Sequence, residues 1–596
     1  MADQPEKNSA GLVTCTIYSE GKKVKSTFEL VSVWIRKEVN RIGKATLVWN
    51  AGNITGVSMK ESEDETFAPG KKIRIEGGYS SVENVLFEGM VTTHRVEVTG
   101  GITGKLVIEC RDYAFPSTLS RRNRLFEKMK DSEAITQILK DYPALSATVE
   151  KTTVKHTELV QYYCSDWDFI LSRADGNGLI VLTEGKKITI HKPVVNSSPV
   201  LEVTYGKDLI DFEGSLETMG QTGKLEAWSW DCAKQELIKV TGVVPSLNKQ
   251  GDAQSADLAK AIGVTGSVLQ TESCADRASL QSWADGCLLK TGLSRIRGAL
   301  RFQGNAKVVP GSLISLKGLG SRFDGDVYVG WVEHELREGD WVTQAGMGIP
   351  CTTRSGHPDV MAPVAAGLLP GIQGLHIGKV IKLNEDPACE YKVQVEFPLL
   401  NGEKNSLWAR MNTFWASEGS GSFFLPDVGD EVVIGFLNND PCHAVLLGSL
   451  YSSKRKPAYE FTAKNNIRGI VSRSKMKLEF EEEKKIITIS TPGKNQIEIS
   501  DDGKWIRLTD QHNNKIEMLE KGIHMESAQE ITLKAKTNIT LDAGMSIEVK
   551  AKKDLSMQGL NIEAKTNATL TAKGAAKAEL SATGQTVVSG ALVKIN

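Results

Sequence analysis

An apolar residue recurs at every eighth position near the end of the chain, and a second apolar residue lies two positions after each. The ten residues of this pattern are Ile523, Met525, Ile531, Leu533, Ile539, Leu541, Ile547, Val549, Leu555 and Met557. The two-residue step is the period of a strand with one buried face. About five polar or small residues follow each step, and such residues suit a corner. A fixed short period predicts a repeat architecture.

One eight-residue unit is too short to enclose a core. At about 3.3 Å per residue it spans roughly 26 Å, which is one side and one corner of a triangular tube. The other two sides come either from the next two repeats, as a solenoid with coils of about 24 residues, or from two further chains. A single-chain coil should have a longer period of three repeats, and the sequence has none. The pattern favours three chains, although the period alone does not exclude the solenoid.

Composition narrows the functions open to the chain. Its 596 residues suffice for three or more domains, and 72 Lys and Arg nearly balance 73 Asp and Glu, which argues against a dedicated nucleic-acid binder. No run approaches 18 apolar residues and the first residues are polar, so neither a membrane span nor a secretory signal is expected. Nine scattered cysteines without CxxC spacing predict reduced thiols, a protein made in the cytosol and no zinc framework.

The first part of the chain predicts short strands and a few helices. Strands between Gly11 and Arg111, separated by joints such as Gly100–Gly101, indicate a small β-barrel. Helices are expected at 132–140, 231–240, 255–262 and 275–290. Asp131 is expected to cap the first of them. A β segment over 299–348 and a Pro-rich linker over 350–370 follow.

Another helix is expected after Ser165, because Ser165 and Asp168 have the spacing of a capping box. Trp167, Ile170, Leu171 and Ala174 then lie on one face of that helix. Asp166 and Asp168 are the carboxylate pair that a catalytic interpretation would use. Acidic residues are favoured in the first turn of a helix by its dipole, so we interpret both as structural.

Residues 374–451 predict a small closed barrel of OB type. Tyr391, Val393, Val395 and Phe397 alternate with polar residues, and about five strands fit this length. The adjacent Cys442 and His443 lack the further ligands that a metal needs, so no metal site is predicted.

Several phrases of this region resemble the VgrG family of spike proteins and related spikes of contractile phage tails. They lie at 374–380, 391–398, 407–410, 414–416, 426–432 and 448–451. The stretches 161–170 and 328–341 resemble the hub of that family, and 514–525 resembles the start of its shaft. The resemblance thus covers nearly the whole chain.

The resemblance implies a mainly β, multidomain homotrimer. Its expected parts are a phage-hub-like domain of two β-barrels plus helices (1–365), an OB-fold domain (372–451), a linker (452–475) and a three-chain intertwined β-helix, or β-prism (476–596). In this arrangement the ten repeat residues form the trimer core of the shaft. No catalytic, cofactor or metal site is expected, and no effector domain is expected after the shaft.

The resemblance also implies partners and a location. The trimer would cap a hexameric tube protein of the Hcp type, nucleate tube assembly on the baseplate, carry non-covalently loaded effectors and puncture the target envelope, touching the membrane only transiently. Leu592, Val593 and Ile595 would either hold a PAAR-repeat tip protein or close the prism. The protein would reside in the bacterial cytoplasm until the machine delivers it outside the cell.

Three alternatives remain. The chain could instead be the spike of a phage tail or of an extracellular contractile injection particle. It could be an OB-fold nucleic-acid binder that stacks bases on Trp408, Phe414, Trp415, Phe423 and Phe424, which its near-neutral charge disfavours. It could be a cell-wall hydrolase, for which the sequence offers no catalytic constellation.

Overall fold

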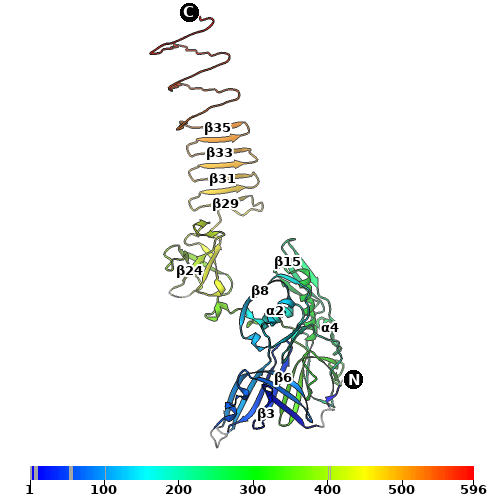
Figure 1. Cartoon of the computed structure of the whole chain (residues 1–596). Helices are drawn as coiled ribbons and strands as arrows, with labels where there is room; N and C mark the ends of the chain where they lie inside the picture. Colours follow the sequence, from blue (N-terminus) through cyan, green and yellow to red (C-terminus); the bar gives the residue numbers. More distant parts are fainter. Residues whose placement is uncertain are drawn as a thin grey trace. The chain divides into compact units, whose positions relative to one another are not determined.

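The protein consists of two compact units, Met1–Leu450 and Tyr451–Asn596, in a computed structural model (Figure 1). The structure describes residues 3–5, 11–52, 58–100, 103–400, 402 and 404–595. Gly101, one of the expected glycine joints, lies outside the described residues. Among those that are described, no helix combines the length and the apolar character needed to cross a membrane.

A sheet of 13 strands dominates the first unit. Its strands are β1 (Val13–Ser19), β2 (Lys22–Lys23), β3 (Glu29–Glu38), β4 (Lys44–Ala51), β5 (Lys72–Tyr79), β6 (Val82–Thr99), β7 (Thr103–Arg111), β13 (Leu201–Thr204), β14 (Leu209–Leu216), β18 (Ile296–Gln303), β19 (Leu313–Lys317), β20 (Gly325–Arg337) and β21 (Asp340–Met347). Neighbouring strands are hydrogen-bonded in the order β14-β18-β21-β20-β3-β4-β7-β6-β5-β1-β2. In addition, β19 pairs with both β13 and β20.

Two separate hydrophobic cores lie on this sheet. One gathers residues such as Ile35, Leu47 and Ile108, and the other residues such as Phe302 and Val329. The antiparallel pairing of β3 with β20 joins the two halves. The strands expected to form a barrel of their own over 11–111 therefore share one continuous sheet with strands beyond residue 200.

Smaller sheets and the helices complete the hub. The strands are β8 (Arg121–Lys130) with β10 (Lys155–Ser165); β9 (Ser146–Val149), β11 (Ile180–Glu184) and β12 (Lys187–His191); and β15 (Leu225–Asp231), β16 (Glu236–Thr241) and β17 (Ser267–Thr271). The helices are α1 (Lys60–Glu63), α2 (Asp131–Leu139), α3 (Asp166–Gly176), α4 (Ser255–Ala261) and α5 (Arg277–Leu293). Short 3-10 turns are η2 (Glu65–Phe67), η3 (Phe115–Thr118), η4 (Arg354–Gly356) and η5 (Val364–Gly367), and η6 (Leu437–Asn439) lies between two strands of the barrel described below.

The helices α2, α3, α4 and α5 confirm four sequence predictions, with one change at a cap. Ser165 caps α3 as expected, because its hydroxyl accepts a hydrogen bond from the backbone N–H of Asp168 at 3.1 Å. Asp131 is not the cap of α2 but its first residue, after Lys130 at the cap position. Its carboxylate instead accepts hydrogen bonds from Arg173 on α3 and from Asn177, the C-cap residue of α3, at 2.6 and 2.8 Å. Asp131 therefore ties the two helices together.

The helix predicted at 231–240 is wrong, because this stretch is the second half of a hairpin. β15 pairs antiparallel with β16, with Trp230 opposite Leu237. Asp231 stabilises the turn by accepting hydrogen bonds from the backbone N–H groups of Ala233 and Lys234, at 2.9 and 3.2 Å. A short apolar run fits either a strand or a buried helix, and here tertiary pairing decides.

The OB-type barrel is confirmed. Its five strands close in the order β22 (His376–Lys382), β23 (Lys392–Glu396), β24 (Ser406–Met411), β28 (Ala444–Ser449) and β27 (Glu431–Phe436), and a small hairpin adds β25 (Ala416–Ser417) and β26 (Ser420–Gly421). Val393, Val395 and Phe397 enter the core as their alternation predicts. Tyr391 does not, because its backbone has φ +58° and its side chain is exposed.

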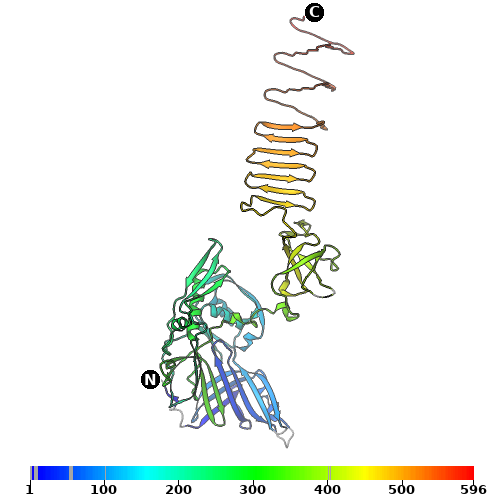
Figure 2. The same cartoon turned by 180° about the vertical axis from the view of Figure 1, so that it is seen from behind.

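The second unit is a single antiparallel sheet followed by an extended chain (Figures 1 and 2). The sheet, here called the shaft sheet, contains β29 (Ile467–Val471), β30 (Lys477–Glu481), β31 (Ile486–Ser490), β32 (Gln496–Ser500), β33 (Trp505–Thr509), β34 (Lys515–Leu519) and β35 (Gly522–Glu526). Strand β29 lies inside the linker expected at 452–475. Residues 527–595, here called the repeat segment, contain no assigned strand.

Candidate functional site

One face of the shaft sheet is made of apolar side chains. Ile489 lies opposite Ile497, which lies opposite Leu508 on the next strand, and the same register continues along the sheet. The apolar face consists of Leu478, Phe480, Ile487, Ile489, Ile497, Ile499, Ile506, Leu508, Ile516, Met518, Ile523 and Met525. Because strand side chains alternate, two apolar residues per strand suffice to build two continuous columns.

Among the described residues, those of this face remain partly exposed to solvent. Exposure is 37% at Ile487, 49% at Ile489 and 39% at Leu508, and it reaches 67% at Ile523 on the last strand. A contiguous apolar surface of this kind marks an interaction site, because single surface hydrophobes are ordinary but aligned columns of them are not.

The opposite face of the shaft sheet is polar and internally paired. Arg507 binds Glu517 at 2.6 Å and lies 3.7 Å from Glu498, while Lys515 reaches Glu517 at 2.7 Å. The hydrogen bond from Lys515, aided by Arg507, lowers the pKa of Glu517. The two faces thus differ: the charged side chains of the polar face pair with one another, whereas the side chains of the apolar face remain partly exposed.

The repeat segment continues the apolar pattern without a partner for its backbone. The ten residues expected to form the trimer core, from Ile523 to Met557, are 55–72% exposed. Within the described residues 527–595, the chain forms no strand ladder that would pair its N–H and C=O groups. An extended backbone gains stability only when these groups are paired, so this segment needs partner strands. The structure also does not form the coils of a single-chain solenoid here.

The residues expected at the tip are also uncovered. Leu592, Val593 and Ile595 are 76%, 47% and 90% exposed. Asn596 lies outside the described residues.

The carboxylates at the start of α3 are held in structural contacts. Asp166 is fully buried and accepts hydrogen bonds from Gln161, Tyr142 and Arg124, at 2.8, 2.7 and 3.0 Å. Burial and the neighbouring carboxylate of Asp166 raise the pKa of Tyr142. Asp168 accepts a hydrogen bond from Arg354 at 2.9 Å. These contacts fix α3 in the hub and leave neither carboxylate facing an open substrate site.

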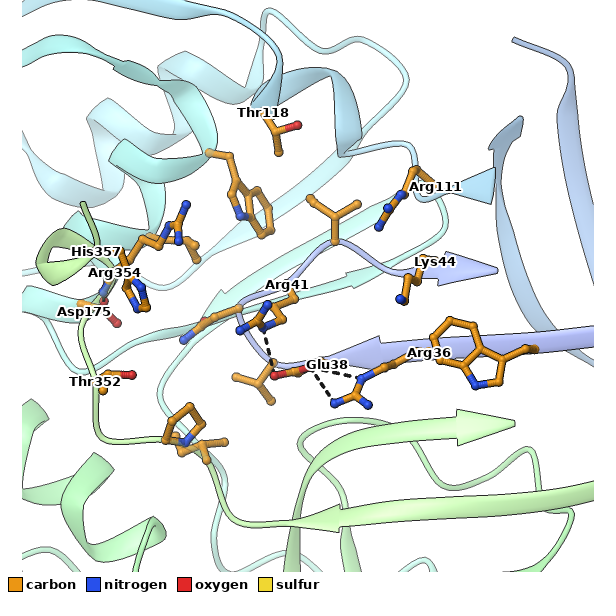
Figure 3. Close-up of a pocket in the computed structure, with 18 residues that line it drawn as sticks. Arg36, Glu38, Arg41, Lys44, Arg111, Thr118, Asp175, Thr352, Arg354 and His357 are labelled. Carbon is orange, nitrogen blue, oxygen red and sulfur yellow. Dashed lines mark hydrogen bonds and ion pairs between the residues drawn. The ribbon is translucent and has the colours of Figure 1, made fainter. Parts of the chain in front are cut away.

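A polar cavity of about 680 Å³ lies beside α3 (Figure 3). Glu38 pairs with Arg36 at 3.2 Å and with Arg41 at 3.0 Å, as the dashed lines in the figure mark. Lys44 lies over the ring of Trp34, 4.4 Å from its centroid. Sequence reasoning missed this cavity because its walls come from β3, β4, α3 and the stretch 349–357. Among its charged residues, Arg36, Glu38 and Arg41 pair with one another, whereas Asp175 pairs with Lys290, which is not part of the lining. Arg354 likewise pairs with Asp168 and Asp359 outside the lining.

The aromatic residues of the OB region lie mostly on its surface. Phe414, Trp415, Phe423 and Phe424 are 55–84% exposed on the loop after β24, whereas Trp408 is half-buried on the strand itself. Trp408 and the loop residues thus do not form one uniformly exposed platform.

The Cys442–His443 pair faces solvent. His443 lies 3.1 Å from Asp440, which also accepts a hydrogen bond from the backbone N–H of Cys442 at 2.8 Å. Across the described part of the chain, no group of three or more His, Cys, Asp or Glu side chains is placed to hold a metal ion.

Three family models match successive parts of the chain. The model for the Alg8 N-terminal domain matches residues 9–338, which is more than half of the 596 residues. The model for the type VI secretion system/phage-baseplate injector OB domain matches residues 376–451. The model for the phage baseplate V C-terminal trimerisation domain matches residues 486–545. The last match contains β31 to β35 and the beginning of the repeat segment.

Individual relatives share shorter stretches. The type VI secretion system spike protein VgrG1a of Pseudomonas aeruginosa is 34% identical over 74 residues, 12% of this chain and 12% of its own length. The spike protein VgrG3 of Vibrio cholerae is 33% identical over 97 residues, 15% of this chain and 10% of its own length. The chain therefore matches only about a tenth of the length of these relatives.

A solved structure of an E. coli protein, c3393, covers 73% of this chain and 99% of its own, at 12% identity and a TM-score of 0.39. Its title describes it as a component of the type VI secretion system, similar to the T4 bacteriophage tail proteins gp27 and gp5. At this TM-score the likeness is too distant to support an argument about the fold.

Proposed function

We propose that this chain, which belongs to the VgrG family and over residues 9–338 to the Alg8 N-terminal domain family, is the trimeric spike protein of a type VI secretion system. The observation that carries the proposal is the uncovered apolar face of the shaft sheet, which lies in the stretch matched by a trimerisation domain. A sheet with one paired polar face and one bare apolar face is suited to be one wall of a three-walled prism.

The trimer would bury what the single chain leaves exposed. Complete burial of a large apolar side chain is worth about 1.5–3 kcal/mol, so a side chain that is still half exposed stands to gain roughly 1 kcal/mol. The ten core residues from Ile523 to Met557 would point to the three-fold axis, and strands of neighbouring chains would pair the backbone of the repeat segment. Part of this gain offsets the entropy of ordering the extended chain.

The remaining roles follow from membership of the family. The hub (1–365) would cap an Hcp-type hexameric tube and contact the baseplate, the OB domain (372–451) and linker (452–475) would connect it to the shaft (476–596), and effectors would load non-covalently. Leu592, Val593 and Ile595 would present an apolar end to a PAAR-repeat tip protein. The protein would wait in the cytoplasm and be driven through the target envelope by the contracting machine.

The role is structural and not enzymatic in this proposal. Asp166 and Asp168, the carboxylate pair that invites a catalytic interpretation, are tied to Arg124, Tyr142 and Arg354. A mechanical spike needs rigidity at these positions and no reactive group.

A second candidate is the spike of a phage tail or of an extracellular contractile particle. The family model that matches residues 376–451 is described with both type VI secretion systems and phage baseplates. The description of the Alg8 N-terminal domain model, which matches residues 9–338, names neither. VgrG1a of Pseudomonas aeruginosa and VgrG3 of Vibrio cholerae are both type VI spike proteins, which favours the first candidate.

A deletion experiment in the native bacterium separates the two candidates. Loss of the chain from a type VI system should abolish release of the Hcp-type tube protein into the medium, and the wild-type gene should restore it. Recovery of free sheathed particles with this chain at their end would instead support the second candidate. Continued tube release without the chain would contradict the proposed function.

A further inference from the structure

Two cysteines that are far apart in the sequence meet on the surface of the hub. The sulfur atoms of Cys232 and Cys274 lie 2.7 Å apart, and both side chains are exposed. Non-bonded heavy atoms rest roughly 3.5–4.0 Å apart, so these sulfurs are closer than an ordinary contact. Both carry free thiols in this structure.

Strand register explains why they meet. β15 and β17 pair in parallel, with Ser229 opposite Thr271. Cys232 lies three residues after Ser229, and Cys274 lies three residues after Thr271, so the two chains leave the sheet side by side.

Hydrogen bonds hold the chains together beyond the sheet. The hydroxyl of Ser229 donates to the carbonyl of Ser273 and accepts from the backbone N–H of Ala275, both at 2.9 Å. On the other side, Asp231 fixes the turn that carries Cys232. The proximity of the sulfurs is thus produced by the backbone and not by two flexible side chains that happen to touch.

We propose that Cys232 and Cys274 form a disulfide when the protein meets an oxidising thiol–disulfide environment, with a low-molecular-weight disulfide such as oxidised glutathione as oxidant. One protein thiolate attacks a sulfur of the small disulfide, which breaks the small S–S bond and releases one small thiol. The second protein thiolate attacks the resulting mixed disulfide, forms the Cys232–Cys274 bond and releases the second small thiol. The two cysteines are oxidised, the small disulfide is reduced, and the two thiol protons pass to the products.

The bond would fasten a part of the hub that has only a small hydrophobic core. The sheet of β15, β16 and β17 packs on α5 through a small core whose buried members are Ala227, Val240, Leu280 and Ala284. A bond from the hairpin turn to the segment before α5 closes a loop between residues 42 positions apart, which restricts local opening. Under the proposed function, the thiols would stay reduced in the cytoplasm and close after export; the site itself does not depend on that function.

Thiol counting on the full-length chain tests the proposal. The purified protein is equilibrated in buffers from reduced to oxidised glutathione, quenched with N-ethylmaleimide and analysed by intact mass and by non-reducing peptide mapping. Two of the nine cysteines should become protected together, with a single linked peptide pair containing Cys232 and Cys274. Cys232→Ser and Cys274→Ser should each abolish the link, whereas Cys389→Ser, at another exposed cysteine, should leave it intact.

Two results would overturn the proposal. In one, all nine cysteines remain alkylated throughout the series; in the other, Cys232 becomes linked to a different cysteine or to a second chain. Because the wild-type map needs no variant, a folding failure of Cys232→Ser or Cys274→Ser would not obscure the answer. The assay also contains no tube or secretion step, so its failure is distinct from a failure of the spike function.

Discussion

The OB barrel and the shaft sheet share the same alternation of apolar and polar residues, yet only the barrel buries its apolar face. Val395 in the barrel is 0% exposed, whereas Ile489 in the shaft sheet is 49% exposed. The barrel closes its five strands on themselves, but the shaft sheet remains a single open layer. The comparison teaches that alternation predicts which face is buried and not which chain covers it.

The largest effect is expected when charges are placed on the apolar positions of the repeat segment. The double variant Ile531→Asp/Ile539→Asp should destroy trimerisation of the shaft, because each buried unpaired charge costs roughly 3–5 kcal/mol and a trimer would hold six of them. Light scattering with mass determination across protein concentrations measures the loss.

The matched control changes the neighbouring residues on the other face. Thr532→Asp/Thr540→Asp adds the same charge, one residue along, and should alter stability by less than about 0.5 kcal/mol per site. Equal damage by both pairs would mean that the repeat has no inward face.

A side-chain deletion in the core of the OB barrel should lower stability by an amount that does not depend on protein concentration. Leu446→Ala removes a fully buried side chain and should destabilise the barrel by about 2–5 kcal/mol. Hydrogen exchange of strands β22 to β28 should report this loss equally at low and high protein concentration. Leu447→Ala, at a position 43% exposed, serves as the control. If the loss of stability disappeared at high protein concentration, the core of the barrel would be covered by another chain, which would contradict this comparison.

A smaller effect is expected at the buried carboxylate of the hub. Asp166→Asn should lower hub stability by about 1–3 kcal/mol, because an amide presents N–H groups to Arg124 and Gln161, which are themselves donors. Asp141→Asn, at a partly exposed partner of the same Arg124, should have little effect. Thermal unfolding followed by circular dichroism compares the two variants. A neutral Asp166→Asn would contradict the structural role assigned to this residue.

A further effect concerns the pH dependence of the hub. Burial, with a contribution from Lys37, lowers the pKa of His334 to about 3 from 6.5, and its ring lies 2.9 Å from the hydroxyl of Thr343. Between these values the unfolded chain binds a proton that the folded chain does not, so stability should fall as pH drops from 6.5 towards 3. The slope is at most ~1.4 kcal/mol per pH unit.

Denaturant unfolding of His334→Gln should have a shallower slope over this range than the wild type. His357→Gln, at an exposed histidine, should keep the wild-type slope. Identical slopes for all three proteins would show that His334 titrates normally.

Local signals in the sequence predict much of the fold. The cap at Ser165, the helical pattern over 275–290 and the alternation from Val393 to Phe397 are all local signals, and the structure confirms each. The ten apolar residues of the repeat are exposed in the single chain. Their role as a trimer core stays a prediction.

The features that sequence reasoning missed depend on distant pairing. The contact between Arg36 and Glu333 joins residues 297 positions apart, and no local pattern indicates it. The segment 231–240 forms a turn and most of strand β16 in place of a helix, because β16 pairs with β15. Cys232 and Cys274 showed no spacing motif, because a parallel register brings them together. In each case the neighbour that decides the structure comes from elsewhere in the chain.

The central claim is that the shaft obtains its core from other chains, and the mass of the full-length protein in solution tests it most directly. Light scattering should give about three times 65.0 kDa for the full chain, and weaker or lost trimerisation for a truncation that ends at Tyr451. A full-length protein that stays monomeric at every concentration would contradict the account, together with the tube and tip partners that depend on it.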